Sequence, residues 1–169
     1  MLTIRYENSA DYVAIRTVHT EAFGRAQEAD LVDALRRVEA LSISLVAVQG
    51  GHIVGHIAFS PVTVTSSTTT IEALGLAPLA VLPAYQRTGT GAQLVEAGLA
   101  TCRATPYGIV VVLGHPHYYS RFGFTIAKRY GIAWEHDAPE EAFMVHELKG
   151  GALEQVRGVV KYRPEFDAV

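Results

Sequence analysis

The feature that most limits the possible folds is a nearly continuous apolar run from Leu74 to Leu82, L-G-L-A-P-L-A-V-L. A run of this kind, without a charged residue, predicts a strand that is covered on both faces. Such a strand needs a sheet with other layers packed against it. Pro78 inside the run cannot donate a ladder hydrogen bond, so we expect the strand to be bulged or open on one side there.

Further strands and helices are expected on both sides of this run. Residues 43–59 predict a hairpin, because Gly50-Gly51 accepts the positive φ of a two-residue turn, and residues 62–73 predict either a second hairpin or a disordered loop tip. Helical stripes are expected over 12–23, over 31–38 and after the glycines at 89–91. The remaining strand candidates are 2–6, 108–113, 143–148 and 158–162. This order, with no repeat or linker, predicts a single mixed α/β domain over residues 1–169.

Composition excludes some classes of protein. Of the 169 residues, 49% are apolar and 18% are charged, which is typical of a globular domain. A net charge of −3 argues against a nucleic-acid partner bound through the overall field. No apolar run approaches the roughly 18 residues of a membrane span, and the N-terminus lacks a signal-peptide core. The sequence therefore predicts a cytoplasmic protein without a membrane or nucleic-acid partner, in which Cys102, the only cysteine, is a small buried hydrophobe.

The stretch Q-R-T-G-T-G, residues 86–91, connects the central strand to a predicted helix. The first turn of a helix leaves backbone N–H groups free and carries partial positive charge, which suits a phosphate. Gly89 and Gly91 have no Cβ and would let a ligand approach the backbone closely. A simple glycine turn explains the same spacing equally well, so both interpretations stay open at this point. Two familiar nucleotide loops do not match, since no lysine follows Gly91 and Leu94 replaces the third glycine of a dinucleotide fingerprint.

A second motif, Y-Y-S-R-F-G-F at residues 118–124, adds to this picture. Together with the apolar strand and Q-R-T-G-T-G-A, it resembles the GNAT superfamily of acetyl-CoA-dependent N-acetyltransferases, over essentially the whole chain. The family pattern of an apolar strand followed by Q/R-x-x-G-x-G/A is matched in full. The resemblance implies a mostly antiparallel central sheet of about six or seven strands, flanked by helices and with a bulged central strand.

The resemblance also implies a cosubstrate, acetyl-CoA, and no metal. In the family, backbone N–H groups of the glycine motif hold the pyrophosphate of coenzyme A, and the preceding strand pairs with the pantetheine arm. The matching positions are Leu79, Ala80, Val81, Gln86, Arg87, Thr88, Gly89, Thr90, Gly91 and Ala92. A metal site is not predicted, because His52 and His56 lie about 13 Å apart along a strand and His115-Pro116-His117 lacks further ligands at familiar spacing.

The chemistry implied by the resemblance is direct attack of a neutral amine on the thioester carbon. A base must remove the proton of the ammonium, and an acid must protonate the departing thiolate. Tyr119 occupies the family's general-acid position, while Glu72 on the central strand is the candidate base. Alternative candidates for the base are Glu28, His115 and His117. The residues expected to line the acceptor site are Phe23, Glu28, His56, Ser60 and Pro61.

The function that the resemblance implies is transfer of an acetyl group from acetyl-CoA to a primary amine of a small molecule, peptide or protein. An alternative is a non-catalytic acyl-CoA sensor or regulatory module of the same fold. A third interpretation is an enzyme that uses a different phosphate-bearing ligand. The C-terminal strands can pair within one chain or between two, so the sequence leaves both a monomer and a homodimer open.

Overall fold

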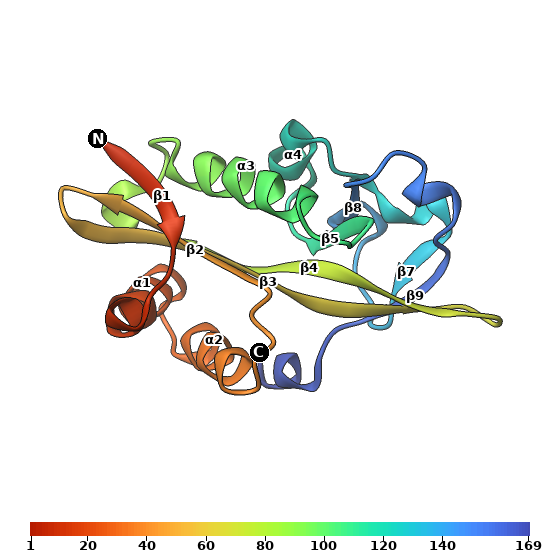
Figure 1. Cartoon of the computed structure of the whole chain (residues 1–169), viewed down its shortest axis with the longest axis horizontal. Coiled ribbons are helices and arrows are strands. Elements are labelled where there is room, and N and C mark those ends of the chain that lie inside the picture. The colour runs from red at the N-terminus through yellow and green to blue at the C-terminus, as the bar shows by residue number, and fades with distance from the viewer. The chain divides into compact units, whose positions relative to one another are not determined.

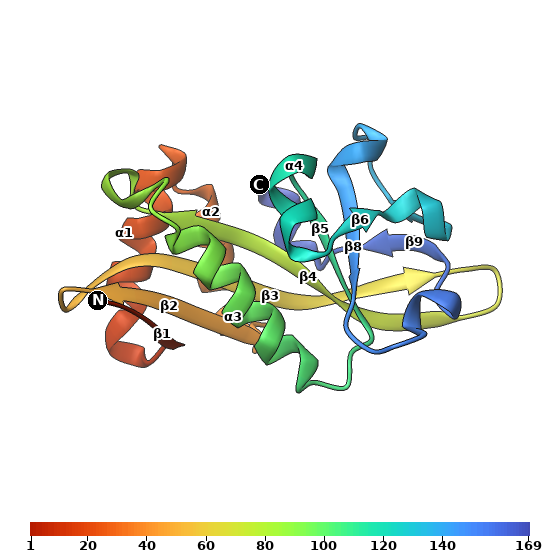
Figure 2. The same cartoon turned by 90° about the horizontal axis from the view of Figure 1, so that it is seen from above.

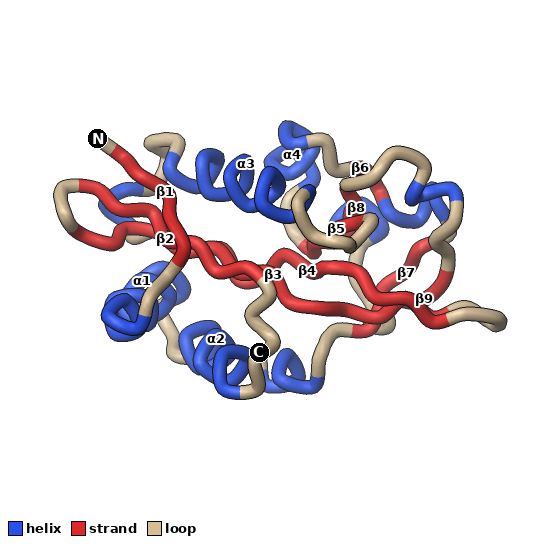
Figure 3. Tube along the Cα trace, viewed as in Figure 1, coloured by secondary structure: helices blue, strands red, loops and turns tan.

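The computed structural model describes all residues from 1 to 169 (Figure 1). Its α-helices are α1 (Tyr12–Phe23), α2 (Gln27–Arg37), α3 (Thr90–Arg103) and α4 (Pro116–Tyr119). Its strands are β1 (Leu2–Tyr6), β2 (Ile43–Gln49), β3 (His52–Thr65), β4 (Thr70–Val81), β5 (Ile109–Leu113), β6 (Thr125–Ile126), β7 (Ile132–Trp134), β8 (Phe143–Glu147) and β9 (Gly158–Lys161). Short 3₁₀ turns connect many of these elements, and Figure 3 shows how helices, strands and loops alternate along the chain.

The chain gathers into two compact units, each built from segments that are distant in sequence. The first unit contains residues 1–60, 77–101 and 164–169, and the second contains residues 61–76 and 102–163. Both β3 and β4 run without a break from one unit into the other. A single domain over residues 1–169 therefore stays a prediction.

The strands of the first unit are antiparallel. β1 pairs with β2, and β2 pairs with β3, so that Ile43 lies opposite Phe59. Gly50 and Gly51 form the turn between β2 and β3 with φ values of +59° and +78°. The predicted hairpin is therefore confirmed, and a shift of register between Ala47 and Val48 gives it one irregularity.

Helices cover both faces of these strands in the first unit. Figure 1 shows α1 and α2 on one face and α3 on the other, and Figure 2 shows α3 lying over β3 from above. Two glycines set this close approach: a Cβ on Gly55 would lie 2.9 Å from Leu94, and one on Gly98 would lie 2.6 Å from Phe59. Successive residues of a strand point to opposite faces, so His56 points away from α3 and toward α1.

The second unit has a mixed pairing pattern. β4 and β5 are parallel at Leu74 and Val110, and β8 pairs antiparallel with both β5 and β6. β9 pairs antiparallel with the end of β3 and parallel with β7. Most strand pairs of the chain are thus antiparallel, as predicted, and the short β6 and β7 add to the six or seven strands expected.

The central apolar run forms most of β4, and Leu74 and Leu76 within it are buried. The peptide bond between Ala77 and Pro78 is cis. The tip before β4 is a tight turn in which Ser66 N–H donates to the Thr69 carbonyl oxygen at 2.8 Å. Of the two alternatives for residues 62–73, the structure therefore has the hairpin-like turn.

Candidate functional site

The glycine stretch forms the N-terminus of α3. The first helical hydrogen bond runs from Gln93 N–H to the Gly89 carbonyl oxygen at 3.0 Å. The N–H groups of Thr90, Gly91 and Ala92 precede that bond, so they belong to the first turn, which has no partners within the helix. Gly89 has a φ of +90°, and no atom lies within 4 Å of the position that a Cβ would occupy. This end of α3 is an open helix N-terminus that an anion can approach.

Two side chains of the loop form hydrogen bonds with nearby backbone carbonyl groups. Gln86 Nε2 donates to the Val81 carbonyl oxygen at 2.9 Å, and Thr88 Oγ1 donates to the Tyr85 carbonyl oxygen at 2.5 Å. Arg87 has a φ of +62°, a conformation that is uncommon outside glycine, and its side chain is exposed. The loop therefore carries an exposed arginine three residues before Thr90, the first residue of α3. The predicted strand positions, Leu79, Ala80 and Val81, are the last three residues of β4.

Tyr119 lies in the second unit at the end of α4, with only 9% of its surface exposed. Its ring makes edge contacts with Tyr118 and Phe124, and a Cβ on Gly114 would lie 2.4 Å from it. Burial raises the pKa of Tyr119, and the phenol of Tyr118 raises it further by a smaller amount. The hydroxyl thus stays protonated at neutral pH, as a proton donor must.

A residue that the sequence did not single out lies near Tyr119. Tyr162 is buried against β4, since a Cβ on Gly75 would lie 2.9 Å from its ring. Burial, with a smaller effect of the Tyr119 phenol, raises the pKa of Tyr162. Tyr119 therefore belongs to an aromatic cluster in contact with the predicted central strand, which local motif spacing does not reveal.

The predicted bases on the strand and loop are solvent-facing. Glu72 is the third residue of β4 and is exposed, and His115 and His117 are exposed at α4. An exposed carboxylate so close to the strand start has the surroundings of an ordinary solvated charge. Glu72 stays a prediction that packing does not support.

A buried polar chain occupies the α1–α2 face of the first unit. His19 Nε2 lies 2.8 Å from His56 Nδ1, and His56 Nε2 lies 2.7 Å from Ser44 Oγ. Ser44 Oγ donates to Glu7 Oε1 at 2.5 Å. Arg36 in turn donates to both oxygens of Glu7, at 2.8 and 2.9 Å. We call His19, His56, Ser44 and Glu7 the polar chain, and both of its histidines are fully buried.

Three of the predicted acceptor residues surround His19. His56 contacts it directly, and the Phe23 ring stacks on it with the centroids 6.1 Å apart. Glu28 is buried, forms an ion pair with Arg25 and acts electrostatically on His19. By contrast, Ser60 lies four residues beyond His56 on β3, and its buried hydroxyl has no hydrogen-bond partner.

His19 was not among the residues predicted from the sequence. Its signal was present, because Ile15, Val18 and His19 form the buried stripe of α1. A histidine on an apolar helix face indicates a polar partner across the interface, although spacing alone does not name that partner.

Burial makes the polar chain sensitive to acid. It lowers the pKa of His19 from 6.5 to about 4, while Glu28 opposes and Arg36 adds to this shift. Burial, with His19 and Arg36, also lowers the pKa of His56 well below 6.5. As pH falls below 6.5, the unfolded chain binds protons that the folded chain does not, so stability must fall.

We therefore expect the free energy of unfolding to decrease between pH 6.5 and 5, with each histidine contributing up to about 1.4 kcal/mol per pH unit. Urea unfolding at several pH values measures this slope. A stability that is flat over this interval would contradict the burial of neutral histidines.

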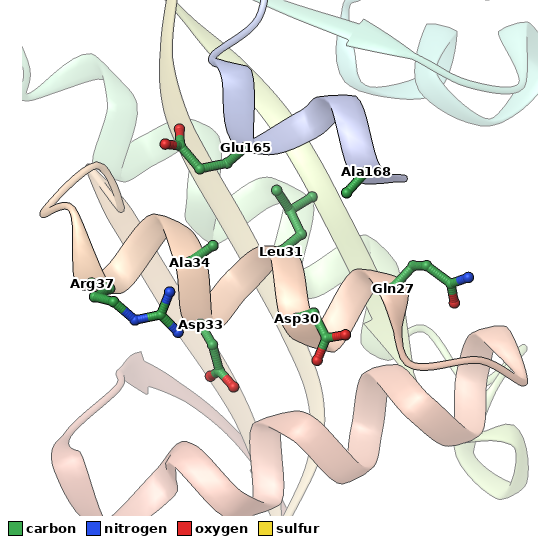
Figure 4. Close-up of a pocket in the computed structure, with 8 residues that line it drawn as sticks. All are labelled: Gln27, Asp30, Leu31, Asp33, Ala34, Arg37, Glu165 and Ala168. Carbon is green, nitrogen blue, oxygen red and sulfur yellow. The ribbon is translucent and has the colours of Figure 1, made fainter.

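A surface pocket lies elsewhere in the first unit, between α2 and the C-terminal turn (Figure 4). Two of its carboxylates, Asp30 and Asp33, form ion pairs with Arg16 of α1 at 3.0 and 2.5 Å. These carboxylates therefore already have a partner on α1. In the structure, no three His, Cys, Asp or Glu side chains come together as a possible metal site. None of the helices has the length and apolar character needed to cross a membrane.

The chain matches a known protein family over most of its length. The family described as "Acetyltransferase (GNAT) domain" matches residues 3–127. The chain therefore belongs to the GNAT acetyltransferases.

Relatives support this assignment over the full length. The uncharacterized N-acetyltransferase YhbS of Escherichia coli K12 is 38% identical over 98% of this chain and 99% of its own. The crystal structure of YhbS in complex with CoA superimposes with a TM-score of 0.91 over 98% of this chain and 92% of that one. A GNAT acetyltransferase from Brucella melitensis in complex with acetyl-CoA is 35% identical, with a TM-score of 0.82 over 99% of both chains. The predicted fold class is thereby confirmed.

Proposed function

We propose that this protein transfers the acetyl group of acetyl-CoA to a primary amine of a small molecule, peptide or protein. The observation that carries this proposal is the open N-terminus of α3, where free N–H groups and Arg87 suit a pyrophosphate. Support also comes from the two similar proteins whose structures contain CoA or acetyl-CoA. A cytoplasmic location stays a prediction.

In the proposed reaction, the lone pair of a neutral amine attacks the thioester carbon, and the carbon–sulfur bond then breaks. We assign the binding of the pyrophosphate to residues 86–92 and that of the pantetheine arm to residues 79–81. Tyr119 donates its phenolic proton to the departing thiolate, a role for which a buried, protonated hydroxyl is suited. The acceptor amine lies near Phe23, Glu28 and His56 in this proposal.

Release of free thiol from acetyl-CoA, measured over a panel of amines, peptides and proteins, tests the function. Amine-dependent release with formation of the acetylated amine is expected for at least one class of acceptor. Saturable acetyl-CoA binding without turnover would instead favour the non-catalytic acyl-CoA sensor. Binding of simple nucleotides in preference to coenzyme A would favour an enzyme for a different phosphate-bearing ligand.

A further inference from the structure

The direction of each hydrogen bond in the polar chain can be worked out from its Glu7 end. A carboxylate only accepts hydrogen bonds, and Glu7 is held by both Arg36 and Ser44. The single hydroxyl proton of Ser44 therefore points to Glu7 Oε1. It follows that Ser44 Oγ can only accept from the histidine on its other side.

The two histidine tautomers follow from that assignment. His56 Nε2 must carry the proton donated to Ser44, so the buried and neutral ring has a bare Nδ1. A bare His56 Nδ1 accepts, and His19 Nε2 must then be the donor in the 2.8 Å contact. Because His19 is also neutral, its remaining nitrogen, Nδ1, has a lone pair and no proton.

His19 Nδ1 is the unsatisfied end of the polar chain. The side chain is fully buried, yet this nitrogen has no hydrogen-bond partner. Buried polar atoms in folded proteins are almost always paired, so this nitrogen has the capacity to accept one further hydrogen bond. A proton donor such as an amine is the complementary chemistry.

We propose that His19 Nδ1 accepts the proton of the acceptor amine and that the polar chain passes a proton on to Glu7, an inference that rests on the proposed acetyl transfer. The amine nitrogen loses its proton as the carbon–nitrogen bond forms, and an N–H bond forms at His19 Nδ1. His19 Nε2–H is transferred to His56 Nδ1, and His56 Nε2–H is transferred to Ser44. The Ser44 hydroxyl proton moves to Glu7, so one proton passes from the amine to the carboxylate.

Charged groups around His19 fit the binding of an amine. Glu28 faces it from α2 and stabilises positive charge there, as does Asp33. Arg36 on the same helix and His56 on β3 oppose a positive charge on the chain, and Arg36 is neutralised by its pairs with Glu7 and Asp33. A transient proton can therefore be accommodated, while a permanent imidazolium is disfavoured.

His19→Gln tests the role of the nitrogen, because glutamine can still donate an N–H to His56 but offers no basic atom. We expect kcat/KM for the amine to fall about 100-fold, within the range of general-base catalysis, with the affinity for acetyl-CoA unchanged. The defect should shrink as the pH is raised toward the pKa of the acceptor, since more amine is then already neutral. His52→Gln makes the same substitution at an exposed histidine on β3 and should retain the wild-type rate and pH profile.

An NMR measurement on the wild-type protein does not depend on activity. ¹⁵N spectra of the labelled imidazoles at pH 7 should show both His19 and His56 as the Nε2–H tautomer. A protonated Nδ1 on His19 would overturn the proposal. If the wild type transfers acetyl groups and the His19→Gln variant has the same rate and pH profile, the proposal is also overturned. A wild-type protein that neither binds acetyl-CoA nor releases thiol would overturn the proposed function itself, even with the expected tautomers.

Discussion

Arg87→Glu should raise the Kd for coenzyme A by about 100-fold. Arg87 is exposed in the loop that leads directly into the first turn of α3, where a pyrophosphate would gain both charge and hydrogen bonds. A hydrogen bond to a charged group contributes about 1.5–3 kcal/mol, and each 1.4 kcal/mol is about tenfold in affinity. The new carboxylate adds repulsion to that loss. Isothermal titration with coenzyme A measures the change.

The matched control for this charge reversal is Arg103→Glu at the opposite end of the same helix. It alters the net charge by the same amount but lies far along α3 from the loop, so the affinity should stay within about threefold because charge effects decay beyond a Debye length. Arg87 is exposed, and its substitution should leave the unfolding temperature nearly unchanged. If Arg87→Glu and wild type bound coenzyme A equally well, the pyrophosphate assignment would be wrong.

Tyr119→Phe should lower kcat by about 100-fold, as expected for loss of a general acid. The ring that packs against Phe124 and the backbone at Gly114 is retained, so only the proton donor is lost. The KM for acetyl-CoA should change little, because the lost interaction acts on the leaving thiolate. Initial rates of thiol release, measured across pH with a productive amine, test this expectation.

Tyr118→Phe is the control for Tyr119, since it makes the same chemical change at the adjacent, half-buried ring. We expect its kcat to stay within about threefold of wild type, because a packing ring keeps its apolar area when the hydroxyl is removed. Equal losses in the two variants would indicate a general effect on the aromatic cluster. An unchanged kcat for Tyr119→Phe would exclude Tyr119 as the general acid. The thiolate would then depart without a proton from this residue.

Much of the fold was predictable because its signals are local. The hairpin at Gly50-Gly51 depends on positive φ at two neighbouring residues, and the structure has it. The N-terminus of α3 follows from glycines placed directly after an apolar strand. The short strands β6 and β7 escaped prediction because two or three residues carry no periodicity, and their pairing with β8 and β9 defines them.

The sequence by itself determined the family, the glycine loop and the tyrosine motif, since each is a set of residue types at short spacing. Only the tertiary structure decided which polar side chains meet. Glu7, His19, Ser44 and His56 are up to 49 positions apart, and their hydrogen bonds arise because α1 packs on the face of β2 and β3 opposite α3. That packing buries His19, whereas Glu72 near the start of β4 is exposed. The burial of a polar side chain cannot be predicted from residue spacing, because it depends on contacts between segments that are distant in sequence.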